Sequence, residues 1–209
     1  MSNNLLLFTC FVQTTEAIGT HAHFISVLGR LHNAPNNQLG FVLPLLDTSP
    51  SAYQILGQPP SFDTITRDTF PAGTTFSTSF VRTVLQGIAA AGLHLHTPGT
   101  RGRGIVHGDL YAHNILVHQG THHPLLTDLG AASFKSAFSE VEQLRLEQIE
   151  VRAFGCLIDD LLSHLDVQGS EVDGTGFTSK LIELRDQCWN ENVAARPSFS
   201  VLSTELAQL

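Results

Sequence analysis

One stretch, Ile105 to Ser133, constrains the fold of this chain more than any other. It reads I-V-H-G-D-L-Y-A-H-N-I-L-V-H-Q-G-T-H-H-P-L-L-T-D-L-G-A-A-S, with Asn114 five positions after Asp109 and Asp128 fourteen after Asn114. Short apolar runs at 115–117 and 125–127 flank a connection that contains a glycine, which predicts a β-hairpin. The fourteen positions from Asn114 to Asp128 leave room for one short hairpin.

This pattern resembles the catalytic loop and metal-binding turn of protein kinases, H-R-D-x-x-x-x-N followed by D-F-G. The resemblance implies that Asp109 and Asn114 are catalytic, Asp109 being the base that takes the proton of the acceptor hydroxyl. It also implies that Asn114 and Asp128 hold Mg²⁺, which prefers oxygen ligands. His107 and Gly130 would be structural. The implied reaction is phosphoryl transfer with ATP and Mg²⁺ as cofactors.

Two later segments extend the resemblance. Glu150-Val-Arg-Ala-Phe-Gly155 is similar to the kinase helix start D-V-W-S-F-G, and Cys188 to Pro197 resembles the C-W-x-x-x-x-x-x-R-P segment. On these motifs the chain is identified as a eukaryotic-like protein kinase of the tyrosine-kinase-like branch, similar to small bacterial homologues. Glu150 and Arg196 would be structural. In the family this arginine pairs with a glutamate, and Glu140 or Glu142 is the expected partner.

The implied fold is α+β and protein-kinase-like, with a mainly helical large lobe over 47–209 and a truncated small lobe over 1–46. His21-Ala-His-Phe24 resembles the segment that follows the regulatory helix of the small lobe, which would then lie around residues 8–20.

The resemblance also places the nucleotide. Leu43 would be the gatekeeper between the lobes, and adenine would meet the Pro44 carbonyl and the Leu46 backbone. Leu116 is expected to contact the cofactor as well. Proline lacks an amide hydrogen, but this position only accepts a hydrogen bond, so Pro44 is tolerated there.

Elsewhere apolar periodicity predicts helices over about 79–96, 146–165, 178–189 and 198–208. Residues 47–78 are rich in Ser, Thr, Pro and Gly and are predicted as a long loop with at most one short helix. Leu39 to Leu46 is predicted as a buried strand that ends at its proline.

Two parts of the family pattern have no match. Both lysines, Lys135 and Lys180, follow Asn114, and the early glycines form no G-x-G-x-x-G loop. One charge-assisted hydrogen bond contributes about 1.5–3 kcal/mol, which is roughly 10- to 100-fold in rate or binding. We therefore expect phosphoryl transfer to be weak. Gly108 stands where the family has arginine, so activation through that arginine is not expected.

Composition narrows the partners. The chain has 209 residues and a net charge of −8, which argues against nucleic acid or an anionic membrane as the main partner. The kinase resemblance implies a protein substrate or binding partner. The apolar run Leu5 to Val12 is too short to span a bilayer. Three widely spaced cysteines, Cys10, Cys156 and Cys188, predict reduced thiols and a cytoplasmic protein. Oligomeric state is not indicated.

Other functions remain open. Without the lysine, the domain could be a pseudokinase that serves as a binding or scaffold module. H-G-D-x-x-x-x-N also resembles small-molecule kinases of the aminoglycoside and choline type, although the segment from Cys188 disfavours them. Tyr111 and His113 occupy the positions of the basic residues that distinguish Ser/Thr from Tyr kinases, so the acceptor type is open. The last alternative is a zinc site drawn from the histidines at 94, 96, 107, 113, 118, 122 and 123.

Overall fold

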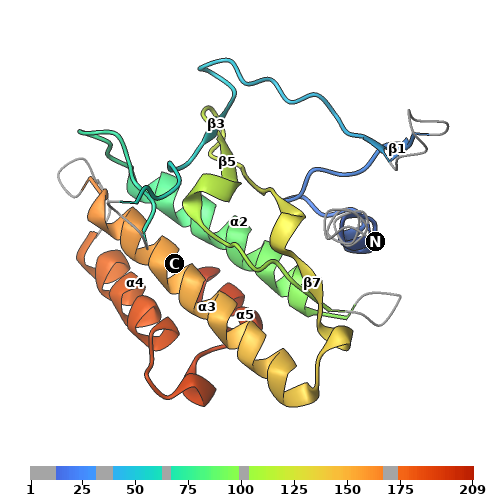
Figure 1. The fold of residues 1–209 in the computed structure, drawn as a ribbon. Coiled ribbons are helices and arrows are strands. Elements are labelled where there is room, and N and C mark those ends of the chain that lie inside the picture. Colours follow the sequence, from blue (N-terminus) through green and yellow to red (C-terminus); the bar gives the residue numbers. More distant parts are fainter. Residues whose placement is uncertain (1–12, 32–39, 63–66, 99–103, 167–173) are drawn as a thin grey trace.

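The computed structural model describes residues 13–31, 40–62, 67–98, 104–166 and 174–209. Within them the chain is a mixed α+β protein (Figure 1). The helices are α2 (Thr78–His96), α3 (Glu140–Ser163), α4 (Gly174–Cys188) and α5 (Phe199–Leu206). The strands are β1 (Gly29–Arg30), β2 (Phe41–Val42), β3 (Tyr53–Ile55), β4 (Ile105–Val106), β5 (Ile115–His118), β6 (Pro124–Leu126) and β7 (Ser133–Phe134).

Helix α2 is the central element, and its prediction is confirmed. Its predicted apolar face is fully buried, with Val84 and Ile88 at 0% exposure. Ser77 caps its start by accepting a hydrogen bond from the Phe80 amide at 3.2 Å. Helix α5 packs closely against α2, because Gly92 presents no side chain where the Phe199 ring lies. The closeness of the two helices therefore depends on a glycine.

Helix α3 lies beside α2 and packs against α4 (Figure 1). It begins at Glu140, six positions before the predicted start at 146. The reason is a capping box: the Ser139 hydroxyl accepts from the Glu142 amide, and the Glu142 carboxylate accepts from the Ser139 amide at 2.8 Å. This first turn leaves Val141 61% exposed, so no buried apolar face marks it in the sequence.

The predicted hairpin is confirmed, as β5 pairs antiparallel with β6 in the register Ile115↔Leu126. The prediction of a loop over 47–78 is wrong at one place, because Tyr53–Ile55 forms strand β3 against the other edge of β5. A strand of three residues carries too little alternation to be seen in the sequence. No helix lies in the described part of 47–77, from which 63–66 are excepted.

The described residues near the start of the chain belong to the same core as the helices. Residues 13–18 are helical, within the predicted range 8–20, whose first part lies outside the described residues. Ile18 and Phe24 are each 6% exposed and contribute to the main apolar cluster. Phe24 also forms a parallel bridge to Leu126, and the Leu126 amide donates to the His23 carbonyl at 2.9 Å.

Four imidazoles line the contact between this early segment and the rest of the chain, and we call them the histidine seam: His21, His23, His94 and His123. His21 stacks on His94 with ring centroids 4.5 Å apart, and His23 stacks on His123 at 4.8 Å. Burial, helped by His94 and then His23, lowers the pKa of His21 to about 4. Burial is also the main cause that lowers the pKa of His23. Burial in the seam therefore favours the neutral form of His21 and His23.

The predicted buried strand Leu39–Leu46 is mostly wrong. Only Phe41–Val42 form a strand, which pairs with β1, and Leu39 lies outside the described residues. Leu43 is 46% exposed and Leu45 is 100% exposed. In Figure 1 the connection from β2 to β3 arches away from the helices.

Across the described ranges, no helix is long and apolar enough to cross a membrane. Residues 5–12 lie outside those ranges.

Candidate functional site

The predicted catalytic loop joins β4 to β5 through one 3₁₀ turn, Ala112–Asn114. The side-chain amide of Asn114 donates to the Asp109 carbonyl at 2.9 Å and to Oδ2 of Asp109 at 2.8 Å. Both acceptors are oxygens, so the nitrogen of the amide must face them. Asn114 Oδ1 is then free of hydrogen bonds to the described residues, although the side chain is buried. An amide oxygen left over in this way suits a hard cation.

His107 holds the loop to the predicted metal turn. Its ring is fully buried, and Nε2 donates to the Thr127 carbonyl at 2.9 Å. Nδ1 therefore accepts, and it receives the Asp109 amide hydrogen at 3.3 Å. The Thr127 amide and hydroxyl both donate to the Asn114 carbonyl, at 2.8 and 2.9 Å. These bonds bring Asp109, Asn114 and the residue before Asp128 into one network.

Asp128 sits in a left-handed backbone conformation, with φ 56°, which places its carboxylate at the start of a 3₁₀ turn. Oδ1 accepts from the Gly130 amide at 3.0 Å, the bond that gives Gly130 its structural place. The side chain is exposed. It lines a cavity of about 90 Å³ together with residues of the early segment and the β6 strand, including Ile18, Phe24 and Leu126.

The predicted nucleotide contacts are not gathered at this cavity. Leu43 lines it, but Pro44 and Leu46 do not. Pro44 is exposed, and Leu46 is partly buried in the arching connection. Leu116 lies on β5 opposite Ile55. A cavity of about 90 Å³ is also smaller than the roughly 300–1,000 Å³ of ordinary ligand pockets.

Glu150 fastens the loop to the helices. It is 3% exposed and lies in α3. Its Oε1 accepts from the Gly108 amide at 2.9 Å, and its Oε2 accepts from Nε2 of His96, at the end of α2, at 2.5 Å. Gly108 itself has φ 82°, and a Cβ there would lie 2.5 Å from the Ala131 carbonyl oxygen. An arginine, as in the kinase motif, does not fit this backbone.

Arg196 does not pair with Glu140 or Glu142, and that prediction is wrong. Its guanidinium donates to the Gln148 carbonyl at 3.0 Å and to the Asn190 carbonyl at 3.1 Å. Both acids instead stand in the first turn of α3, where negative charge faces the positive end of the helix dipole and Glu142 completes the cap.

No lysine is placed to anchor phosphates. Lys135 is 12% exposed and bonds to the His96 carbonyl at 2.7 Å and to Glu147. Lys180 bonds to two glutamates on the helices α4 and α5. Near the start of the described residues, the guanidinium of Arg30 forms a bidentate ion pair with Glu16, which the sequence analysis did not predict.

Asp68 is a site residue that the sequence did not reveal. Its side chain is 1% exposed, and it bonds to both the backbone and the ring of His113. His113 in turn faces Asp109. Asp68 lies in a segment of loop-like composition, where one more aspartate carries no distinguishing signal. Next to this cluster, burial raises the pKa of the Tyr111 hydroxyl, and Cys156 and Asp109 add to the effect.

Apart from His122, each of the seven histidines named for a zinc site forms a hydrogen bond through its ring to another described residue or to its own turn. His94 bonds through Nε2 to the Ile18 carbonyl at 2.7 Å, and His123 through Nε2 to the Ala22 carbonyl at 2.9 Å. His118 accepts two amides of its own turn through Nδ1. Among the residues that the structure describes, no group of three or more His, Cys, Asp or Glu side chains could hold a metal ion.

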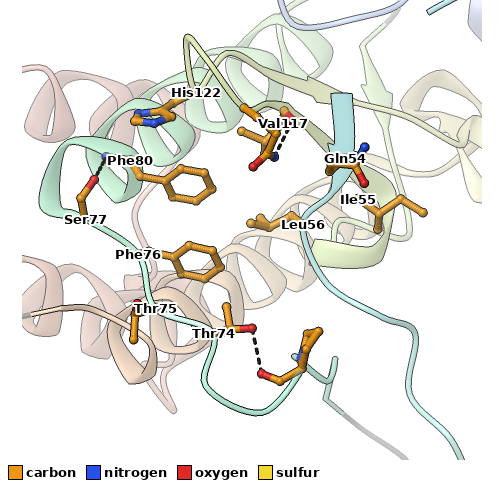
Figure 2. A pocket seen from close by; sticks show the side chains of 12 residues that line it. Gln54, Ile55, Leu56, Thr74, Thr75, Phe76, Ser77, Phe80, Val117 and His122 are labelled. Atoms are coloured by element: carbon orange, nitrogen blue, oxygen red, sulfur yellow. Dashed lines mark hydrogen bonds between the residues drawn. The ribbon is translucent and has the colours of Figure 1, made fainter. Parts of the chain in front are cut away.

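A larger hollow of about 390 Å³ is lined by residues of β3, of β5 and of the segment that leads into α2. Figure 2 shows Phe76 and Phe80 along its wall, with rings stacked at 4.6 Å between centroids. His122 meets Phe80 edge-on at 5.1 Å, and Leu56 and Val117 also line the hollow. None of the residues predicted for the kinase site lines this hollow, although His122 is one of the histidines named for the zinc alternative.

Comparison with models of protein families and with curated proteins returned no match.

Proposed function

We propose that this chain has a protein-kinase-like fold and transfers the γ-phosphoryl group of ATP to a protein hydroxyl, at a low rate. The observation that carries the proposal is the hydrogen-bonded network of the loop. Asn114 holds Asp109 through its amide, and His107 and Thr127 hold the Asp128 turn against the same loop. These residues match the H-x-D-x-x-x-x-N and D-x-G pattern at the required spacing.

The chemistry assigned to each residue follows from its contacts. Asp109 is 39% exposed, so its carboxylate can accept the proton of an incoming hydroxyl group. Mg²⁺ would be held by Asn114 Oδ1 and the Asp128 carboxylate, which are oxygen ligands. When bound, the ion would neutralise charge on the phosphates. The chain's own part is to hold Asp109 in place and to keep the amide oxygen of Asn114 free.

The proposed rate is low because neither lysine of the chain is available to bind the phosphates of ATP. Lys135 and Lys180 are both committed to glutamates. Loss of the lysine bond alone removes about 10- to 100-fold. The same facts favour a second candidate, a pseudokinase that binds a protein partner in the cytoplasm without turning over ATP. The small cavity beside Asp128 also favours this candidate.

Titration calorimetry separates the two candidates. The full chain and the Asp128→Asn variant are each titrated with ATP, with and without Mg²⁺. Asp186→Asn is the matched control, because Asp186 is exposed on α4 and forms an ion pair with its neighbour Arg185. Metal-dependent binding that Asp128→Asn loses and Asp186→Asn keeps supports the enzyme. Absence of binding to every form refutes it and leaves the pseudokinase.

A further inference from the structure

Asp68 and His113 form a rigid pair beside Asp109. Oδ2 of Asp68 accepts from the His113 amide at 2.9 Å, and Oδ1 accepts from Nδ1 of the ring at 2.8 Å. A carboxylate that is 1% exposed needs such partners, because an unpaired buried charge is costly. Two bonds to one residue fix both the backbone and the ring. His113 therefore has one orientation, set by a residue 45 positions away in sequence.

That orientation aims the second ring nitrogen at Asp109. Since Nδ1 donates to Asp68, the nitrogen left over is Nε2, and it lies 3.5 Å from Oδ2 of Asp109. Tyr111 backs the His113 ring, with the ring planes 8° apart and centroids at 6.1 Å. The ring is 19% exposed, so it has little room to turn.

The two oxygens of Asp109 then differ. Oδ2 receives the Asn114 amide at 2.8 Å and faces His113 Nε2. No hydrogen bond to the described residues uses Oδ1. With the side chain 39% exposed, the carboxylate has one confined oxygen and one open oxygen.

We propose that Asp68 and His113 are positioning residues for Asp109: they confine Oδ2 so that Oδ1 is the oxygen presented to the acceptor hydroxyl. This inference rests on the proposed function. Misplacement of a reacting group by about 1 Å can cost on the order of 100-fold in rate. The pair should therefore affect turnover, whereas ATP affinity depends on other residues.

Turnover can be measured without a known protein substrate by following hydrolysis of Mg-ATP, with water as the acceptor. Asp68→Asn, His113→Gln and the double variant are compared with the full chain, and Asp186→Asn is the control. Each single change should lower kcat by about 10- to 100-fold and leave KM for ATP within about twofold. Because the two residues act as one unit, the double variant should lose no more than the worse single variant.

A second readout does not depend on turnover. In protein labelled with ¹³C at aspartate carboxyls, the resonance of Asp109, assigned through Asp109→Asn, should move in His113→Gln and stay in place in Asp186→Asn. Equal kcat in all forms, or an Asp109 resonance unmoved by His113→Gln, would overturn the positioning role. A full chain that hydrolyses no ATP refutes the proposed function instead, and the carboxyl resonance then decides whether the pair confines Asp109. His113→Gln keeps an amide donor for Asp68, so the inference remains testable if Asp68→Asn does not fold.

Discussion

Removal of the Glu150 carboxylate should destabilise the whole chain. Its two oxygens take the Gly108 amide at 2.9 Å and the His96 ring at 2.5 Å, at 3% exposure. In Glu150→Ala the buried His96 ring loses this partner, and the Gly108 amide loses its acceptor. Each lost hydrogen bond to this carboxylate costs about 1.5–3 kcal/mol, and two of them are a large part of the roughly 5–15 kcal/mol that hold a domain folded.

The Glu150→Gln variant tests how much of the lost free energy of unfolding is due to the charge of the carboxylate. A carboxamide has one oxygen, so it can accept from Gly108 or from His96 but not from both in the same way. We expect this variant to lose one hydrogen bond to a charged group, about 1.5–3 kcal/mol. Glu150→Ala should therefore have the lower denaturant midpoint of the two.

The assay is urea unfolding followed by the fluorescence of Trp189, the only tryptophan in the chain. Its ring lies near the guanidinium groups of Arg67 and Arg185, at 5.9 and 5.3 Å from the ring centroid, so unfolding changes its surroundings. Glu191→Ala, at an exposed position, is the control and should stay within about 0.5 kcal/mol of the parent chain. If Glu150→Ala unfolds at the same urea concentration as the control, Glu150 does not hold the loop to the helices.

Three further predictions concern other parts of the fold. The pKa of His21 is about 4 in the folded chain, and the pKa of His23 is also lowered, so the unfolded chain binds more protons below about pH 6.5. The free energy of unfolding should therefore fall as the pH drops from 7 towards 4. In His21→Asn the urea midpoint should depend less on pH than in the parent chain. Gly92→Val should cost about 1–3 kcal/mol by crowding the Phe199 ring, seen as a lower thermal midpoint. Burial raises the pKa of the Cys188 thiol to about 12, so iodoacetamide at pH 8 should label it only in urea, and labelling of the folded chain would contradict its burial.

Sequence pattern could predict the elements whose burial is periodic. The predicted bounds of helix α2 and of the β5–β6 hairpin are close to the observed ones. The reason is that the apolar residues of these elements follow the helix or strand period and are buried, as Val84, Ile88 and Ile115 are. The contacts within the loop are also local: Asn114 reaches Asp109 over five positions.

Contacts between residues far apart in the sequence could not be predicted. Asp68 meets His113 over 45 positions, and nothing in its own neighbourhood marks it. Arg196 was predicted to pair with Glu140 or Glu142, but its guanidinium donates to backbone carbonyls. Helix α3 begins earlier than predicted, and Glu142 caps its start. Strand β3 is stabilised by the edge of β5 and carries no period of its own.

The histidine seam limits how far the chain can be truncated from its start without loss of folding. Ile18 and Phe24, which lie within the predicted remnant lobe of residues 1–46, are part of the same core as the helices. His23 also packs against Gly87 of α2 so closely that a Cβ there would lie 2.8 Å from its ring. A chain begun at residue 47 would open that core to water along α2. The smallest piece able to fold by itself therefore includes residues 18–24, and a truncation series should show a loss of cooperative unfolding once they are removed.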